Sequence, residues 1–437
     1  MDRLNPVFLP PDHPQRLVLA GEVHARPPQP VSTPSRATYL AVLVEAEDRD
    51  REWVHVAALC ARFGVAGPQV GEIQFSATIG EITLRWERHG EFSGYSFIAA
   101  GSGAAPFEAA STATLPPDWL AAIPGRTLVA ARAELMALAE SEPDMAVVAG
   151  YFGENIVVGA AIAEGAGCAF TDFRVDDEGF SRWVLMDRHF TPRQAGRMLQ
   201  RLFEIEAYRM LALLALPIAR AQSPLIVADE KALAALTEGI AREGGNEEVL
   251  LQDLTRLAAG VESGLAASQF RFGATSAYAE LVQTRIAELR ESRIPGIQTI
   301  DEFMARRFTP AVRTCATVAR RLHGLSERVA QASGLLATRV GIARERQNQA
   351  LLSSMDRRAM LQLRLQQTVE GLSLAAIAYY VAGLVGDAAR GLQAAGARVD
   401  PELAVGLALP LIGVGAFLVL RRARRHLGAD EAAPRVR

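Results

Sequence analysis

Two apolar stretches near the C-terminus constrain the fold of this chain more than any other feature. Neither Gly371 to Gly386 nor Leu403 to Leu420 contains a charged residue. A membrane-spanning helix needs about 20 apolar residues, with a range of ~17–25. The second stretch meets that length directly and the first meets it with its flanks, so the sequence predicts transmembrane helices at 371–386 and 403–420. Buried core helices are the less typical alternative for uncharged runs of this length.

Arginines beside the two stretches predict how the chain crosses the membrane. Arg357, Arg358 and Arg364 precede the first span. A basic tail at 421–437 follows the second span and opens with four arginines: Arg421, Arg422, Arg424 and Arg425. The external connector at 387–402 holds two arginines against three carboxylates. Because basic residues are retained on the cytoplasmic side, both outer flanks and both termini are expected in the cytoplasm.

The composition sets the broad class of the protein. With 437 residues, half of them hydrophobic, the chain is long enough for two or three structural units. The net charge of −3 gives no general attraction for nucleic acid, so nucleic acid is not predicted as a partner. Cys60, Cys168 and Cys315 are far apart, which argues against a zinc site or a disulfide framework and suits a reducing compartment. Residues 1–16 lack the apolar core of a secretory signal.

A Pro-rich N-terminal arm at 1–36 precedes a region at 37–190 whose pattern mixes strands and helices. Ile82, Leu84 and Trp86 alternate with polar residues, which is the period of a half-buried strand. Similar reasoning predicts strands at 38–44, 72–78, 81–87, 92–98, 146–148, 156–162 and 169–175, and helices at 48–63 and 126–140. The region is therefore predicted to be an α+β cytoplasmic domain.

From residue 191 the chain is predicted to be almost wholly helical, with a helical region at 191–300 and a long stalk helix at 301–370. Thr191 and Pro192 supply a helix cap and a first-turn proline. Six apolar residues of the stalk follow one another in steps of four and three, which is coiled-coil spacing: Val318, Leu322, Leu325, Val329, Ala332 and Leu336. This face needs a partner, either the preceding helices folded back on it or identical chains.

One face of the stalk helix carries a polar stripe into the first span. Its residues recur every three or four positions and therefore share one side of a helix. Ten of them are candidate pore-lining residues: Asn348, Met355, Gln362, Gln366, Glu370, Ser373, Ile377, Tyr380, Leu384 and Asp387. If several copies surround an axis, Glu370 and Asp387 form acidic rings, which favour cations. The alternative is that Ser373 and Tyr380 pack against the second span and the two acids are ordinary flanks.

Charged residues of the N-terminal half form a candidate polar cluster: Glu22, His24, Arg26, Arg85, Glu87, Arg88 and His89. The first three alternate, so in an extended segment they share a face on which Glu and His are capable of acid–base chemistry and Arg of binding an anion. A structural clamp or a surface ion-pair network is the alternative. Asp172 and Asp176 offer oxygen ligands for a cation, or else belong to an ordinary turn before Gly179.

Motifs that name a reaction are absent from the sequence. It contains no phosphate-binding loop, no Rossmann glycine pattern after a strand, no nucleophile elbow and no zinc-protease motif. No catalytic residue is therefore predicted, and no enzyme activity is favoured. No cofactor is evident either.

Five long motifs run through nearly the whole chain: GEVHARP at 21–27, LRWERHGEFSGYSF at 84–97, TDFRVDDEGFSRWVLMD at 171–187, PRQAGRMLQRLFEIEAYRMLALLALPIAR at 192–220 and SMDRRAMLQLRLQQTVEGLSLAAIAYYVAGLVG at 354–386. These motifs resemble a bacterial family of uncharacterised, predicted membrane-anchored proteins defined by a domain of unknown function. The resemblance implies attachment to the bacterial inner (cytoplasmic) membrane and carries no assigned activity.

The layout is also similar to that of CorA-type divalent-cation channels, which are pentamers. Those channels carry a Gly-Met-Asn signature at the end of the first span, where this chain has Gly383, Leu384 and Val385. The departure argues against magnesium selectivity, and the similarity is one of fold-level layout.

Together these features predict an α+β cytoplasmic domain, a long-helix bundle or stalk, and a C-terminal two-helix transmembrane hairpin. The function expected is that of an oligomeric CorA-like cation channel or transporter with a cytoplasmic regulatory domain. A membrane-tethered cytoplasmic scaffold or regulatory module without transport activity is the alternative. Membrane lipid and identical chains are the expected partners, and a divalent cation is the one ligand that this layout suggests.

Overall fold

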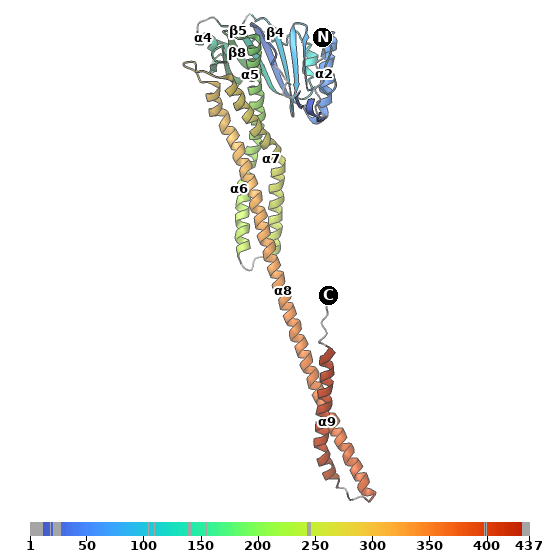
Figure 1. Cartoon of the computed structure of the whole chain (residues 1–437). Coiled ribbons are helices and arrows are strands. Elements are labelled where there is room, and N and C mark those ends of the chain that lie inside the picture. The colour runs from blue at the N-terminus through green and yellow to red at the C-terminus, as the bar shows by residue number, and fades with distance from the viewer. Residues whose placement is uncertain are drawn as a thin grey trace. The chain divides into compact units, whose positions relative to one another are not determined.

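The computed structural model describes residues 12–17, 19–20, 28–103, 105–108, 110–138, 142–153, 155–242, 246–396, 398 and 400–430 (Figure 1). It divides into two compact units, Met1–Gly334 and Leu335–Arg437. The first unit contains an eight-stranded mixed sheet and long helices, and the second contains the rest of helix α8 together with α9.

The sheet of the first unit has the strand order β2-β3-β4-β1-β5-β8-β7-β6. The strands are β1 Ser35–Leu43, β2 Gln74–Ile79, β3 Ile82–Arg88, β4 Phe92–Ala100, β5 Arg126–Ala137, β6 Val158–Ile162, β7 Gly167–Val175 and β8 Ser181–Asp187. The short helices beside them are α2 Arg49–Arg62, α3 Pro117–Ala121 and α4 Met145–Tyr151. These bounds confirm the strands predicted at 38–44, 72–78, 81–87, 92–98, 156–162 and 169–175, and the helix predicted at 48–63.

Each half of the sheet follows the same order of elements: a strand, a helix, and a three-stranded meander whose last strand pairs with the first. β1, α2 and β2–β4 form one half, and β5, α4 and β6–β8 form the other. The two first strands, β1 and β5, pair antiparallel at the centre. Among the described strands, β5 and β8 are the one parallel pair, whereas the corresponding pair β1 and β4 is antiparallel. The sheet is therefore mixed, and its halves share an order of elements without sharing all strand directions.

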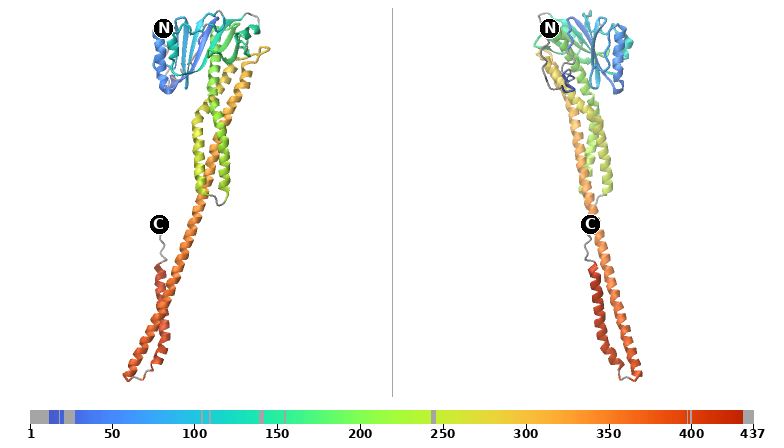
Figure 2. Two further views of the ribbon diagram at one scale, coloured as in Figure 1. Left: turned by 180° about the vertical axis from the view of Figure 1, so that it is seen from behind. Right: turned by 45° about the vertical axis from the view of Figure 1, so that its right-hand side comes forward.

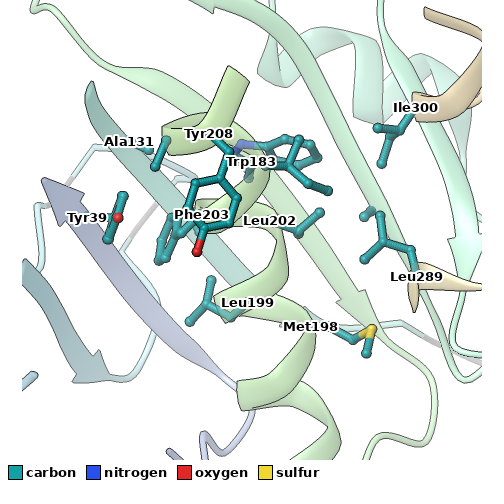
Figure 3. Close-up of a cluster of buried hydrophobic side chains, with 14 of the residues drawn as sticks. Tyr39, Ala131, Trp183, Met198, Leu199, Leu202, Phe203, Tyr208, Leu289 and Ile300 are labelled. Atoms are coloured by element: carbon teal, nitrogen blue, oxygen red, sulfur yellow. The ribbon is translucent and has the colours of Figure 1, made fainter. Parts of the chain in front are cut away.

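Helix α5 (Pro192–Leu213) covers one face of the central strands and forms the main core with them (Figure 3). Its cap is the predicted one, because the Thr191 hydroxyl accepts a hydrogen bond from the N–H of Gln194. Tyr39 of β1 stacks on Phe203 of α5 with ring centroids 4.9 Å apart, and Trp183 of β8 is fully buried beside them. On the opposite face, α2 and α3 cover β3 and β4, and α4 covers β7 and β8.

Two predicted elements are wrong. Residues 126–140, predicted as a helix, form strand β5, because Val129, Ala131 and Ala133 alternate into the main core. Residues 146–148, predicted as a strand, lie in helix α4, which Asp144 caps by accepting from the N–H of Ala146. Strand β8 is absent from the predicted elements.

Helices α6 (Ala215–Ala241), α7 (Glu247–Leu289) and the first part of α8 (Ile300–Ala394) lie side by side (Figure 2). The predicted coiled-coil face of α8 is buried among them, with exposed fractions of 4% or less for Val318, Leu322, Leu325, Val329 and Ala332. Arg321 and Arg328 of α8 donate to Glu230 of α6 at 2.8 and 3.3 Å, and Ser326 donates to Glu262 of α7. The partner of this face is therefore the chain's own preceding helices.

The edge of the sheet at β6 is covered by the segment that joins α7 to α8. Ala161 and Ser292 exchange two backbone hydrogen bonds, of 3.0 and 2.8 Å. The N–H of Gly159 donates to the carbonyl of Gln298 at 2.9 Å. An unpaired edge strand is a template for association with other chains, so this segment protects the sheet.

In the second unit, α8 continues to Ala394 and α9 follows from Pro401 to Asp430. Gly386 of α8 lies close to Val405 of α9, since a Cβ at Gly386 would be 3.1 Å from Cγ2 of Val405. Across the described residues, three helical segments are long and apolar enough to cross a membrane: α5 with α6, α8, and α9. In the most apolar 18-residue stretch of each segment, 28%, 6% and 0% of the residues are buried, respectively. The apolar stretches of α8 and α9 therefore leave their side chains almost wholly uncovered.

Candidate functional site

A polar groove runs along the N-terminal half of α5, where this helix meets β3 and α7. Three adjoining cavities form it, and neighbouring cavities share lining residues. The cavity at one end measures about 380 Å³ and is lined by Gln74, Ser76, Arg85 and the segment Pro28–Pro30. The cavity at the other end, which we call the arginine cavity, measures about 290 Å³. It is lined by Pro28, Arg197, Gln200, Arg201, Glu204, Arg285 and Glu288.

Hydrogen bonds join β3 to α5 across the floor of the groove. Arg85 forms an ion pair with Glu87 at 2.6 Å and donates to the side chain of Gln200 at 3.5 Å. Gln200 in turn donates to Glu204 at 2.7 Å. Both members of the Arg85–Glu87 pair have side chains about nine-tenths buried, so the pair is held in place by the packing of α5 on the sheet.

The same network continues from α5 to α7. Arg285 of α7 donates to Glu204 and, at 3.0 Å, to Glu288. Arg201 donates to the Glu288 carboxylate at 2.9 Å and to the Glu288 carbonyl at 3.1 Å. Glu288 therefore accepts from two arginines, and its side chain is 36% exposed against 16% for Glu204. It is the carboxylate at the rim of the arginine cavity.

The spacing along α5 explains why these residues face the groove. Arg197, Arg201 and Glu204 recur every three or four positions, and the core-facing residues of the helix occupy the other side. Gly196 lets the segment before β1 approach, because a Cβ there would lie 1.7 Å from the carbonyl oxygen of Gln29. That segment forms one wall of the groove.

The arginine cavity carries an excess of positive charge. The lining holds the guanidinium groups of Arg197, Arg201 and Arg285 against the carboxylates of Glu204 and Glu288. Arg193 lies one helical turn before Arg197 on α5. Burial raises the pKa of Glu204, against the opposing effect of Arg285. Burial also lowers the pKa of Arg201, although a guanidinium remains charged in proteins. The arrangement is suited to an anion.

The structure divides the predicted polar cluster. Arg85 and Glu87 lie in the polar groove. Arg88 lies on the opposite face of β3, where its Nε is 3.7 Å from a carboxylate oxygen of Glu52. His89 follows in the turn to β4 and stacks on a core phenylalanine. Alternation along the strand separates the two arginines, so the cluster is not one site.

Other predicted residues lie outside the part of the chain that the structure describes. They are Glu22, His24 and Arg26 of the N-terminal arm, so acid–base chemistry on that segment stays a prediction. The side chains of Arg422, Arg424 and Arg425 are outside it as well, whereas Arg421 is exposed on α9.

A buried carboxylate that sequence reasoning missed lies under α2. Glu52 is fully buried, and its carboxylate lies 3.7 Å from both Arg49 and Arg88. Burial raises the pKa of Glu52. Its position was inferable, because Glu52, Val56 and Leu59 share one helical face and the last two are apolar.

Asp172, a predicted cation ligand, is paired within the chain. Arg182 donates to Asp172 at 2.7 Å and Asn155 donates to it at 2.8 Å. Asp176 accepts backbone hydrogen bonds within the turn at Gly179. Nowhere in the described ranges do three or more His, Cys, Asp or Glu side chains gather as a metal-binding group.

The predicted polar stripe lies on α8 in the second unit, and nine of its ten candidate side chains are exposed there, with Glu370 half-buried. Five of them line a concave strip of about 500 Å³: Gln362, Gln366, Glu370, Ser373 and Ile377. Glu370 accepts a hydrogen bond from Gln366 at 3.3 Å. Asp387 forms an ion pair with Arg390 at 3.1 Å. The two acids therefore differ, since a cation of the chain already neighbours Asp387.

Comparison with family models matches residues 11–427 to the family described as Protein of unknown function (DUF3422). The chain belongs to this family. The match confirms the resemblance that the five motifs indicated, and it covers both the polar groove and the stripe of this DUF3422 protein.

Comparison with curated proteins and with solved structures gives no match to this DUF3422 chain. The similarity of layout to CorA-type channels stays a prediction. Membership of DUF3422 brings no activity with it, so the function is argued from the chain's own residues.

Proposed function

We propose that this protein is an integral protein of the bacterial inner membrane, in which residues 371–386 and 403–420 form a transmembrane hairpin. The observation that carries the proposal is the uncovered apolar surface of α8 and α9. Only 6% and 0% of the residues in their most apolar 18-residue stretches are buried. Leu372, Leu384, Leu411 and Val419 are each more than half exposed. Apolar surface of this extent requires lipid or another apolar partner.

The proposed orientation places both termini in the cytoplasm. Arg357, Arg358 and Arg364 precede the first span, and Arg421 opens the basic tail after the second. Basic residues near a span are retained on the cytoplasmic side. The link between α8 and α9 then lies outside the cytoplasm.

We further propose that several copies associate through the polar stripe of α8 and that this stripe lines a path for cations. The concave strip at Gln362, Gln366 and Glu370 supports this function, because its polar groups are exposed although they adjoin an apolar span. Polar groups next to lipid are costly, and copies arranged about an axis would give them partners and water. Glu370 would form an acidic ring at the cytoplasmic end.

The test is cation flux into liposomes that contain the purified full-length chain. The described cysteines are all buried, so a cysteine introduced into a span is the reactive one. We expect a thiol reagent to block flux in Tyr380→Cys, which lies on the stripe. Tyr379→Cys, one residue off the stripe and equally exposed, should keep its flux. If liposomes that contain the protein pass neither divalent nor monovalent cations, the proposed cation path is wrong.

A membrane-tethered scaffold or regulatory module is the second candidate. The ion pair between Asp387 and Arg390 favours it, because a neighbouring guanidinium weakens an acidic ring at the outer end of the stripe. On this alternative the spans only anchor the soluble unit. Exchanging 371–420 for an unrelated transmembrane hairpin would then leave the protein's cellular role unchanged, whereas a pore would be lost.

A further inference from the structure

We infer that the arginine cavity binds the phosphate group of a small anionic ligand. The cavity lies in the first unit and is independent of the membrane proposal. It is polar, it measures about 290 Å³, and three of its seven lining residues are arginines. Guanidinium groups recognise phosphate through paired, charge-assisted hydrogen bonds.

The arginines of α5 are only partly used within the chain. Arg201 is paired with Glu288, but Arg197 is exposed and makes no hydrogen bond or ion pair with a described residue. Arg193 lies one helical turn earlier, is also exposed and is equally without such a partner in the described chain. Like charges one turn apart destabilise a helix unless something lies between them. An anion at this face relieves that repulsion.

The net positive charge of the cavity indicates how many negative charges its ligand carries. Three guanidinium groups against two carboxylates leave one positive charge in excess at the lining, and the exposed Arg193, one helical turn before Arg197, adds a second beside it. A phosphate monoester carries close to two negative charges at neutral pH and offers three acceptor oxygens, as phosphorylated side chains do. A single carboxylate supplies one charge and two oxygens. Phosphate therefore matches both the charge and the donors.

Glu288 is the residue that a ligand would replace. It accepts from both Arg201 and Arg285, and its side chain is the more exposed of the two carboxylates. Rotation of Glu288 toward solvent would release the guanidinium of Arg201 from its carboxylate partner and leave Arg285 paired with Glu204 alone. Glu204 would keep its hydrogen bond from Gln200.

The neighbouring cavity gives room for the rest of the ligand. It measures about 380 Å³ and shares the residue Pro28 with the arginine cavity. Gln29, Gln74 and Ser76 line it with amide and hydroxyl groups, which suit the uncharged polar part of a phosphorylated metabolite. Pockets for small ligands measure about 300–1,000 Å³, so the groove is of the size for a small molecule.

The experiment measures binding to the purified full-length protein in detergent by titration calorimetry. The probes are inorganic phosphate, pyrophosphate and a nucleoside diphosphate, each compared with sodium chloride at equal ionic strength. We expect binding that tightens from phosphate to the nucleoside diphosphate, as a ligand reaching the neighbouring cavity would give. Tightest binding of inorganic phosphate would instead identify the free ion as the ligand, with the arginine cavity still its site.

The deciding variants change exposed residues that the fold does not need. Arg193→Ala together with Arg197→Ala should weaken binding by about tenfold or more. Arg174→Ala removes an arginine that is also exposed, on β7, and should leave binding unchanged. Glu288→Gln should tighten binding, because it removes the competing carboxylate, and a merely structural role would not give that result. Absence of binding by every probe, or equal binding by the double variant and the wild type, would overturn the proposal.

Discussion

The buried carboxyl of Glu52 makes the stability of this protein depend on pH. Glu52 is enclosed under α2, and burial raises the pKa of its carboxyl above the value in the unfolded chain. The proton is therefore held more tightly in the folded state. The contribution of Glu52 to stability is fully present below the unfolded pKa and is lost as the pH rises through the folded pKa.

We expect Glu52→Gln to be more stable than the wild type at about pH 8 and equally stable at about pH 4. Glutamine keeps the shape of the side chain and stays neutral throughout. Thermal unfolding across this range measures the difference, at about 2–4 °C in Tm for each kcal/mol. Asp50→Asn, exposed on the same helix, should show no such trend. A difference in Tm that did not change with pH would exclude the charge as its cause.

Gly196 is the residue on which one wall of the polar groove depends. In Gly196→Ala, the new Cβ would meet the backbone of Gln29 at 1.7 Å, so the segment before β1 must move away. We expect a Tm several degrees lower and faster proteolysis near Gln29. Gly273→Ala is the control, since nothing lies within 4 Å of a Cβ there and alanine favours a helix by up to ~1 kcal/mol. Equal stability of the two variants would contradict the close approach.

At the residue scale, the sequence predicted which residues belong to a polar site better than it predicted which of them contact one another. Arg85 and Arg88 were grouped by closeness in the chain, although strand alternation places them on opposite faces of β3. Arg285, which completes the groove, lies 81 residues beyond Glu204 in the chain, and no spacing rule connects positions so far apart. Glu52 escaped notice because a charged residue in a helix is ordinarily solvated.

At the scale of elements, periodicity predicted long helices and alternating strands well and failed where composition was misleading. Residues 126–137 are rich in alanine, leucine, arginine and glutamate, which favour helices. The segment is nevertheless a strand, because β1 and β8 pair with it on both sides. Propensity is a weak prior that tertiary pairing overrides. The coiled-coil spacing of α8 was confirmed, and only the structure could identify its partner as α6 and α7.

The packing of α8 on α6 and α7 gives an element-scale prediction. Leu325 is fully buried in this bundle, so Leu325→Ala should lower the free energy of unfolding by about 2–5 kcal/mol. Leu335, ten residues on, is 60% exposed, and Leu335→Ala should change it by less than ~0.5 kcal/mol. Chemical denaturation followed by circular dichroism measures both. Similar losses in the two variants would mean that the bundle is not held by this face.

The whole molecule combines a unit with buried hydrophobic cores and a unit whose long helices leave most of their apolar side chains exposed. The full chain should therefore require detergent for extraction from membranes, and should migrate as a multiple of its 47.0 kDa mass. Residues 1–334 alone should stay in solution as a monomer, because α6 and α7 already cover the coiled-coil face. Light scattering measures both masses. A monomeric full chain in detergent would remove the oligomer, and with it the cation path.

At the scale of the whole molecule, the sequence was most informative about the class of protein and least informative about its function. Uncharged stretches and family motifs span many residues, so each is specific without knowledge of the fold. Which polar residues meet in space is decided by the strand order and by helix packing. The order β2-β3-β4-β1-β5-β8-β7-β6 could not be derived from local patterns, because three of its seven adjacent pairs, β4–β1, β1–β5 and β5–β8, join strands that are not consecutive in the chain.

The cover over strand β6 has a consequence for biosynthesis. Gln298 and Ser292 complete this edge, yet they follow β6 by well over a hundred residues. At ~5–20 residues per second, a nascent sheet leaves the ribosome on the order of ten seconds before its own cover arrives. During that interval the exposed edge of β6 is able to pair with strands of other nascent chains that are being translated from the same mRNA. Slower translation of α5 to α7 would lengthen this exposure. A chaperone that binds exposed strands would reduce the association of chains through β6.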